Sequence, residues 1–111
     1  MMTKLRKAVD QLVQSELDLA SAQHGERFHS AHEAYAVILE EYQEAKEQLL
    51  ATERVLDIFW KCCRNDKCDE IQSVEAVWWE SMLAACECIQ IAAMAQKAMR
   101  GYKVDKDKLD E

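Results

Sequence analysis

The stretch that decides the fold is EAYAVILEEYQEAKE, residues 33–47. Its apolar side chains recur every three or four residues, which predicts an amphipathic helix. Because each residue advances a helix by about 100°, Glu41 falls about 20° from Ala34, in the middle of the apolar face, and Glu44 falls at its edge. A carboxylate among buried apolar side chains is unfavourable unless a cation or a hydrogen-bonded partner compensates it. Glu41 therefore needs such a partner.

The composition is that of an all-α protein. The 111 residues include no proline and only two glycines, and this length predicts a single domain over residues 1–111. A net charge of −7, from 14 basic and 21 acidic residues, argues against nucleic acid or an anionic membrane as a partner. It is compatible with a phosphorylated ligand bound through a divalent cation. The sequence has no signal-peptide core and no membrane-spanning run, so we expect a cytoplasmic protein.

The five cysteines allow two interpretations. Cys62, Cys63 and Cys68 lie close together in the sequence, and three thiolates with a fourth ligand could bind structural zinc. Their spacing matches the usual C-x2-C pattern poorly, and no histidine lies nearby. Cys86 and Cys88 lie in an apolar segment. We therefore expect reduced thiols that act as small hydrophobic side chains.

Helix start and stop signals divide the chain into amphipathic segments. Gly25 predicts the end of a first helix, and Ser30 with Glu33 forms an S-x-x-E capping box that predicts the start of a second. The apolar spacing leaves open whether that second helix breaks near 51–53. We expect an antiparallel bundle of about four helices, completed by oligomerisation. The predicted elements are a helix over about 3–24, the motif helix from about 31, a last helix over about 70–100 and a charged tail over 101–111.

The last helix contains a second isolated acid. Residues 81–96, SMLAACECIQIAAMAQ, carry one charge, that of Glu87, and are apolar on nearly every side, which predicts a central, buried helix. No opposite charge lies three or four residues from Glu87, whereas Gln90 can reach the same region. Carboxylates that converge raise one another's pKa, and a hard divalent cation with oxygen ligands removes that penalty. We therefore expect Glu41, Glu44 and Glu87 to share a cation.

Each of these residues also has a simpler interpretation. Glu41 could form a core salt bridge or a subunit contact, and Glu44 could be a solvated surface residue. Glu87 could accept a hydrogen bond from a tyrosine or tryptophan in the core. For Trp78 and Trp79, a place in the core or in a subunit interface is favoured over a platform on which bases stack.

Two segments together resemble a known family. HEAYAVILEEYQEAKE, followed by ECIQIAAMAQKAM, is similar to the all-α NTP pyrophosphohydrolase superfamily, often called MazG-like, and in particular to its small phage and prophage-type members. The hallmark of the superfamily is E-E-x-x-E on one helix and E-x-x-D on a later one. The resemblance covers roughly residues 28–100, and the spacing between the two motifs is longer here than is usual.

The resemblance implies a set of metal ligands. Glu41 and Glu44 match the metal-binding acids of the first motif, and Glu87 matches the first acid of the second. Gln90 stands where the family usually has Asp, so the site lacks one negative charge, although an amide oxygen can also bind Mg²⁺. The implied cofactor is Mg²⁺, held by these four residues.

The resemblance further implies hydrolysis of a nucleoside triphosphate to the monophosphate and pyrophosphate. Glu40, Glu41 and Glu44 would be the catalytic acids, with Glu40 activating water, and Lys97 and Arg100 would contact phosphates. Cations near the end of a helix also suit its dipole, which is the simpler interpretation of these two. Members of the family form homo-oligomers, so we expect a dimer or tetramer. The alternative is a catalytically inactive helical-bundle interaction protein of the same fold.

Overall fold

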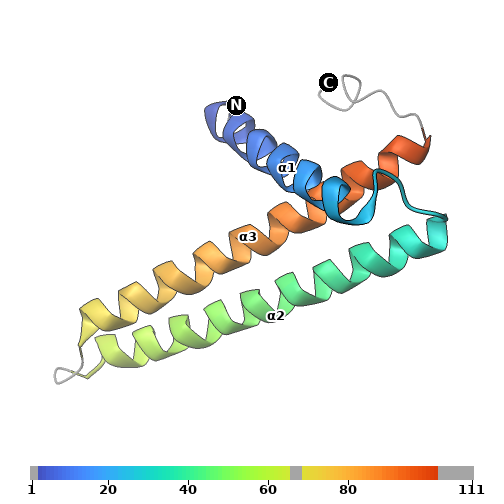
Figure 1. Cartoon of the computed structure of the whole chain (residues 1–111). Helices are drawn as coiled ribbons and strands as arrows, with labels where there is room; N and C mark the ends of the chain where they lie inside the picture. Colours follow the sequence, from blue (N-terminus) through green and yellow to red (C-terminus); the bar gives the residue numbers. More distant parts are fainter. Residues whose placement is uncertain (1–2, 66–68, 103–111) are drawn as a thin grey trace. The chain divides into compact units, whose positions relative to one another are not determined.

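The computed structural model describes residues 3–65 and 69–102, and its regular structure is entirely helical (Figure 1). The helices are α1 (Thr3–His24), α2 (Ala31–Cys63) and α3 (Glu70–Tyr102). Over these residues no strand is formed, so the predicted all-α class is confirmed. Three helices, rather than about four, make up this part of the chain. The predicted tail, from 103 onward, lies outside the described residues.

The connection between α1 and α2 is built from the two signals found in the sequence. Gly25 follows the last residue of α1 with a φ of 88°, a value that side chains disfavour, and its N–H donates to the Ser21 carbonyl at 3.0 Å. Ser30 Oγ accepts the Glu33 N–H at 3.1 Å. The Glu33 carboxylate in return accepts the His29 N–H at 3.3 Å, one residue earlier than in the usual capping box.

Helix α2 runs without a break through residues 51–53. Thr52, the residue least suited to a helix there, donates its hydroxyl to the Gln48 carbonyl one turn earlier, at 3.0 Å. The alternative of two shorter helices is therefore wrong, and this is why three helices form instead of four.

Helix α3 starts at a cap and ends later than predicted. The Asp69 carboxylate accepts the N–H groups of Ile71 and Gln72 at 3.1 and 3.2 Å, which satisfies donors that the first turn leaves unpaired. At the other end the helix includes Gly101 and stops at Tyr102. The predicted stop at Gly101 is therefore early, within the usual uncertainty of helix ends.

The helices form two compact units, and α2 and α3 contribute to both. Unit 1 comprises Met1–Glu40 and Ile89–Glu111, and unit 2 comprises Glu41–Cys88. In unit 1, Val13 and Leu17 of α1 are buried against α3. The core of unit 1 consists of Val13, Leu17, Ala93 and Met94, bordered by Ala20, Phe28, Val37, Ile38, Ile89 and Ala92.

Unit 2 is a hairpin in which α2 and α3 lie side by side (Figure 1). Small side chains, Ala45 on α2 and Ala84 on α3, are buried and allow the helices to approach closely. Gln48 of α2 bridges to α3, where its side-chain N–H donates to the Glu80 carboxylate and, at 3.3 Å, to the Glu80 carbonyl. Within residues 3–65 and 69–102, no helix is long and apolar enough to cross a bilayer.

Two expectations about burial and cysteine chemistry need correction. In unit 1 the last helix is buried as predicted, with Ala93 completely inaccessible. In unit 2 the predicted buried segment is not buried, because Met82 is 51% exposed and Cys86 and Cys88 are exposed as well. Trp78 and Trp79, which precede this segment, are 59% and 55% exposed. Their rings pack against each other with centroids 6.0 Å apart. A place in the core, one of the two predicted alternatives, is wrong, and a place in a subunit interface stays a prediction.

The cysteines differ from one another. Cys62 is buried and disulfide-bonded, so the prediction of reduced thiols is wrong for this residue. Cys63, Cys86 and Cys88 carry free, exposed thiols. Cys68, the third member of the cluster considered for zinc, lies outside the described residues.

Candidate metal centre

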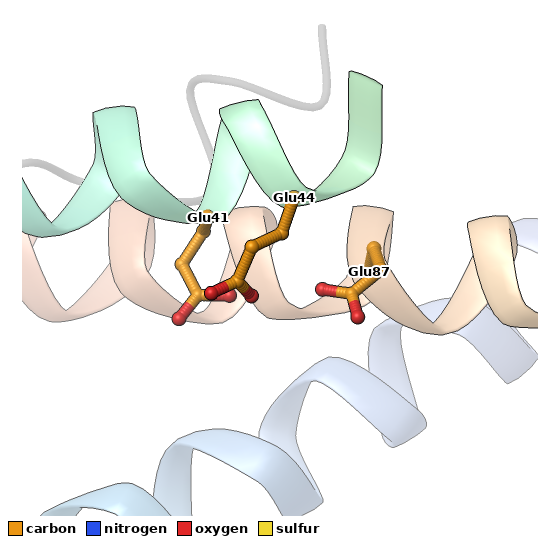
Figure 2. Close-up of side chains that lie close together, drawn as sticks. All are labelled: Glu41, Glu44 and Glu87. Atoms are coloured by element: carbon orange, nitrogen blue, oxygen red, sulfur yellow. The ribbon is translucent and has the colours of Figure 1, made fainter. Parts of the chain in front are cut away.

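Three carboxylates from two helices meet within unit 2. Glu41 and Glu44 lie one turn apart on α2, and Glu87 lies on α3 (Figure 2). Each offers a carboxylate oxygen, and these three oxygens all lie within 4.8 Å of one another. Glu41 points to this place because it shares a helical face with the buried Ala45, one turn later. The structure thus brings together the three acids that the sequence predicted to converge.

The three acids differ in their contact with water. Glu41 and Glu87 are half-buried, whereas Glu44 is exposed. Burial raises the pKa of Glu87 above its ordinary value of 4.5, and the negative charge of Glu44 and a hydrogen bond with Glu44 raise it further. Ionisation of Glu87 is therefore opposed both by burial and by another acid of the cluster.

The donor set fits a hard divalent cation. All three groups are carboxylates, and Mg²⁺ prefers oxygen ligands in an octahedral arrangement that usually retains several waters. The exposed Glu44 leaves one side of the cluster accessible to water or to a ligand's own oxygens. A bound cation would offset the repulsion between the charges of Glu44 and Glu87, and this makes binding of the cation more favourable.

Gln90, the fourth predicted ligand, belongs to unit 1. It lies on α3, one turn beyond Glu87, and its side-chain N–H donates to the Glu16 carboxylate of α1 at 2.7 Å. Metal binding by the Gln90 oxygen stays a prediction. Sequence reasoning missed Glu16, although the rule that singled out Glu41 applies to it as well. Glu16 follows Leu12 by four residues and Val13 by three, and so falls on the apolar face of α1.

The predicted phosphate-binding residues make contacts inside unit 1. Lys97 is only 5% exposed, and its Nζ lies 4.4 Å from the centre of the Phe28 ring, a cation–π contact. Arg100 Nη1 donates to Ser21 Oγ at 2.9 Å and to the Glu26 carbonyl at 3.0 Å. Both cations hold the α1–α2 connection against α3. Their contact with a phosphorylated ligand stays a prediction.

Two further acids flank the cluster in the sequence. Glu40 directly precedes Glu41, is exposed and is counted in unit 1. Glu80, seven residues before Glu87, lies on the same face of α3 and is held by Gln48. The pair of Gln48 and Glu80 was not predicted, although the seven-residue spacing from Glu87 is a signal that could have found it.

The raised pKa of Glu87 predicts how metal-free stability depends on pH. Below the ordinary pKa of 4.5, Glu87 is protonated in both the folded and unfolded states. As pH rises, the unfolded state loses this proton first, so the contribution of Glu87 to stability falls until pH passes its folded-state pKa. The free energy of unfolding of wild type minus that of Glu87→Gln, measured by urea denaturation with a chelator present, should therefore fall over this window. A flat or rising difference would contradict the raised pKa.

Comparisons with known proteins provide no relative from which the role of this cluster could be transferred. Its chemistry must therefore follow from the three carboxylates and their surroundings. No protein-family model, no curated protein and no solved structure matches the chain.

Proposed function

We propose that the protein is a Mg²⁺-dependent nucleoside triphosphate pyrophosphohydrolase of the MazG-like superfamily. The observation that carries the proposal is the convergence of Glu41, Glu44 and Glu87 within 4.8 Å. Glu41 and Glu44 are the second and third acids of the first motif that resembles the superfamily, and Glu87 is the first acid of the second motif. The three acids come from two different helices. An accidental acidic face on a single helix would not produce this arrangement.

The roles of the residues follow from their positions. Bound Mg²⁺ supplies charge neutralisation and orientation of the triphosphate. Glu41 and Glu87, both half-buried, and the exposed Glu44 would be the three ligands that hold the ion. Because the chain carries a net charge of −7, a triphosphate is repelled unless a cation lies between it and the carboxylates.

The remaining catalytic residues act on water and on the phosphates. Glu40 accepts a proton from the attacking water, whose oxygen forms a bond with a phosphorus atom of the substrate. The anhydride bond between the α- and β-phosphates breaks, which releases pyrophosphate and leaves the monophosphate. The resemblance assigns phosphate contacts to Lys97 and Arg100, whose present partners lie in unit 1.

We propose further that the protein assembles as a homo-oligomer, a dimer or tetramer, in the cytoplasm. The support is the surface of unit 2, where large apolar side chains are more than half exposed. These are Leu49, Ile58, Trp60, Ile71, Trp78, Trp79 and Met82. Apolar surface on this scale in so small a protein is typical of an interface.

A second candidate function is supported by the contacts of three predicted site residues. Gln90 replaces the usual acid and is held by Glu16, and Lys97 and Arg100 already have partners in unit 1. An interaction protein that keeps the fold but has lost hydrolysis fits these contacts. In that case the three glutamates bind a cation weakly or not at all.

A panel of canonical and modified nucleoside triphosphates, assayed for pyrophosphate release with Mg²⁺, distinguishes the two functions. We expect release from at least one substrate, dependent on Mg²⁺. Loss of a group that holds the catalytic metal typically lowers the rate by about 100-fold or more, so Glu41→Gln should reduce release by at least that factor. The control is Glu53→Gln, an exposed acid on the same helix, which should leave the rate unchanged.

A second variant tests whether the glutamine at position 90 is the reason for any lack of activity in the wild-type protein. Gln90→Asp restores the usual acid and should increase Mg²⁺-dependent release. It is best made together with Glu16→Gln, because two carboxylates would otherwise face each other where a 2.7 Å hydrogen bond now lies. If neither wild type nor the double variant releases pyrophosphate from any substrate, hydrolysis is rejected and the interaction protein is favoured.

A further inference from the structure

Helix α3 carries an exposed apolar stripe over its first half, in unit 2. The stripe consists of Ile71, Val74, Trp78 and Met82, which follow one another at three- and four-residue spacing and therefore lie on one helical face. Their exposed fractions are 72%, 48%, 59% and 51%. This face points away from the side of α3 that packs on α2, where Ser73 and Ala84 are buried. The described chain leaves the stripe uncovered.

The stripe begins at a hollow with acidic walls. A pocket of about 300 Å³ is lined by Phe59 of α2 and by Ile71 and Val74 of the stripe, with Glu70 and Glu75 at its walls. A volume of this size accepts a leucine or isoleucine side chain. From 69 to 96 the sequence contains five acids and no lysine or arginine. The surface therefore fits an apolar side chain carried by a basic segment.

The first half of α1, in unit 1, has this chemistry. Leu5, Val9 and Leu12 follow at i, i+4 and i+7, and all three are exposed. The helix has no acid in its first turn, while Lys4 and Lys7 lie in its first two turns. Cations are unfavourable at a helix N-terminus because they face the positive end of the helix dipole. A partner rich in carboxylates would remove this penalty.

We infer that the first half of α1 of one copy docks on the α3 stripe of a second copy. A leucine of α1 enters the hollow at Phe59, and Lys4 and Lys7 lie against Glu70 and Glu75. The inference rests on the proposed assembly into a homo-oligomer and is independent of the proposed hydrolysis.

Reciprocal docking makes a dimer with two equivalent contacts. Each α1 lies on the partner's α3, which is the closed, two-fold arrangement that most homodimers adopt. A stable interface takes about 800 Å² from each partner. Two contacts per dimer, each with three apolar side chains of α1 against a stripe that includes a tryptophan, provide surface on this scale.

Charge reversal tests the docking, with no nucleotide or metal present. The mass of the particle is measured by sedimentation across a wide range of protein concentrations for wild type, for Lys4→Glu/Lys7→Glu and for Glu70→Lys/Glu75→Lys. Each double variant should weaken self-association by about tenfold or more, because four attractive charge pairs per dimer become repulsive. An equimolar mixture of the two double variants should restore association. The matched control is Lys46→Glu/Glu53→Lys, two exposed charges of α2, which should associate as wild type does.

The possible results distinguish the proposed docking from a dimer formed through another surface and from a monomer. A dimer that none of the reversals weakens overturns the docking but leaves the proposed assembly standing, and a chain that is monomeric throughout overturns both. If Trp78→Lys abolishes the dimer while Lys4→Glu/Lys7→Glu leaves it intact, the stripe pairs with something other than α1, and the docking fails. Because all of the changed side chains are exposed, far-ultraviolet circular dichroism should remain that of wild type. A double variant that is misfolded is recognised by loss of this signal, and two folded double variants that fail to associate when mixed overturn the docking.

Discussion

Replacing Glu87 with glutamine is expected to abolish stabilisation of the fold by Mg²⁺ and to make the metal-free protein more stable at neutral pH. Without metal, both burial and the negative charge of Glu44 oppose the ionisation of Glu87. A neutral amide of similar shape removes both of these costs. With metal, the same change removes one of three carboxylates that lie within 4.8 Å. The two effects have opposite signs, and no general loss of folding produces both.

The size of the metal effect follows from mass action. A ligand present at about 100 times its dissociation constant stabilises the state that binds it by about 2.7 kcal/mol. Wild type should gain this much at such a concentration of Mg²⁺ or Mn²⁺, and Glu87→Gln should gain almost nothing. The measurement is urea denaturation with metal and with chelator. Glu53→Gln, in which an exposed acid outside the cluster is changed, should behave as wild type. Equal metal-dependent stabilisation of wild type and Glu87→Gln would remove the basis of the metal centre.

Truncation of Leu17 is expected to lower the stability of the protein by about 2–5 kcal/mol, the range seen when a buried leucine is replaced by alanine. Leu17 is 3% exposed and packs with Val13 of its own helix against Ala93 and Met94 of α3. The facing alanine is already small and cannot fill the space that the lost side chain leaves. Since all four residues of this core are in contact, the loss should loosen the whole packing of α1 on α3.

Leu19 provides the control for this truncation. It lies two residues further along α1 and is 54% exposed, so Leu19→Ala removes the same atoms without leaving a cavity, and the expected change is within about 0.5 kcal/mol. Both variants are compared by thermal and urea denaturation. Similar losses for the two would mean that α1 is held by its exposed face rather than by the core of unit 1.

The ends of the helices were predictable because their signals are local. Gly25, Ser30 and Asp69 each act on backbone groups within a few residues, and each does so in the structure. The continuity of α2 was not predictable, because a threonine inside an apolar stripe fits a helix and a helix end equally well. The disulfide of Cys62 was also missed, since cysteine pairing depends on positions in space.

The candidate site was predictable from places where the helical pattern is violated. Glu41 and Glu87 are acids on faces otherwise made of apolar residues, and two such violations on different helices suggested that they meet. What each acid contacts is a different question. Glu16 pairs with Gln90 across 74 positions of the chain, and such a partner is set by the register between two helices. Periodicity within one helix carries no information about that register.

The hydrogen bond between Glu16 and Gln90 constrains how the sequence of this protein can change. A single substitution of Gln90 by Asp would place two carboxylates against each other at a contact that is now 2.7 Å. If Glu16 is replaced by a neutral residue first, the hydrogen-bond acceptor is lost, but no charge remains at the contact between the two helices. This intermediate should therefore still fold. A lineage that gains or loses an acid at position 90 is therefore expected to alter position 16 beforehand. In any set of natural relatives, the two positions should change together, with at most one carboxylate between them.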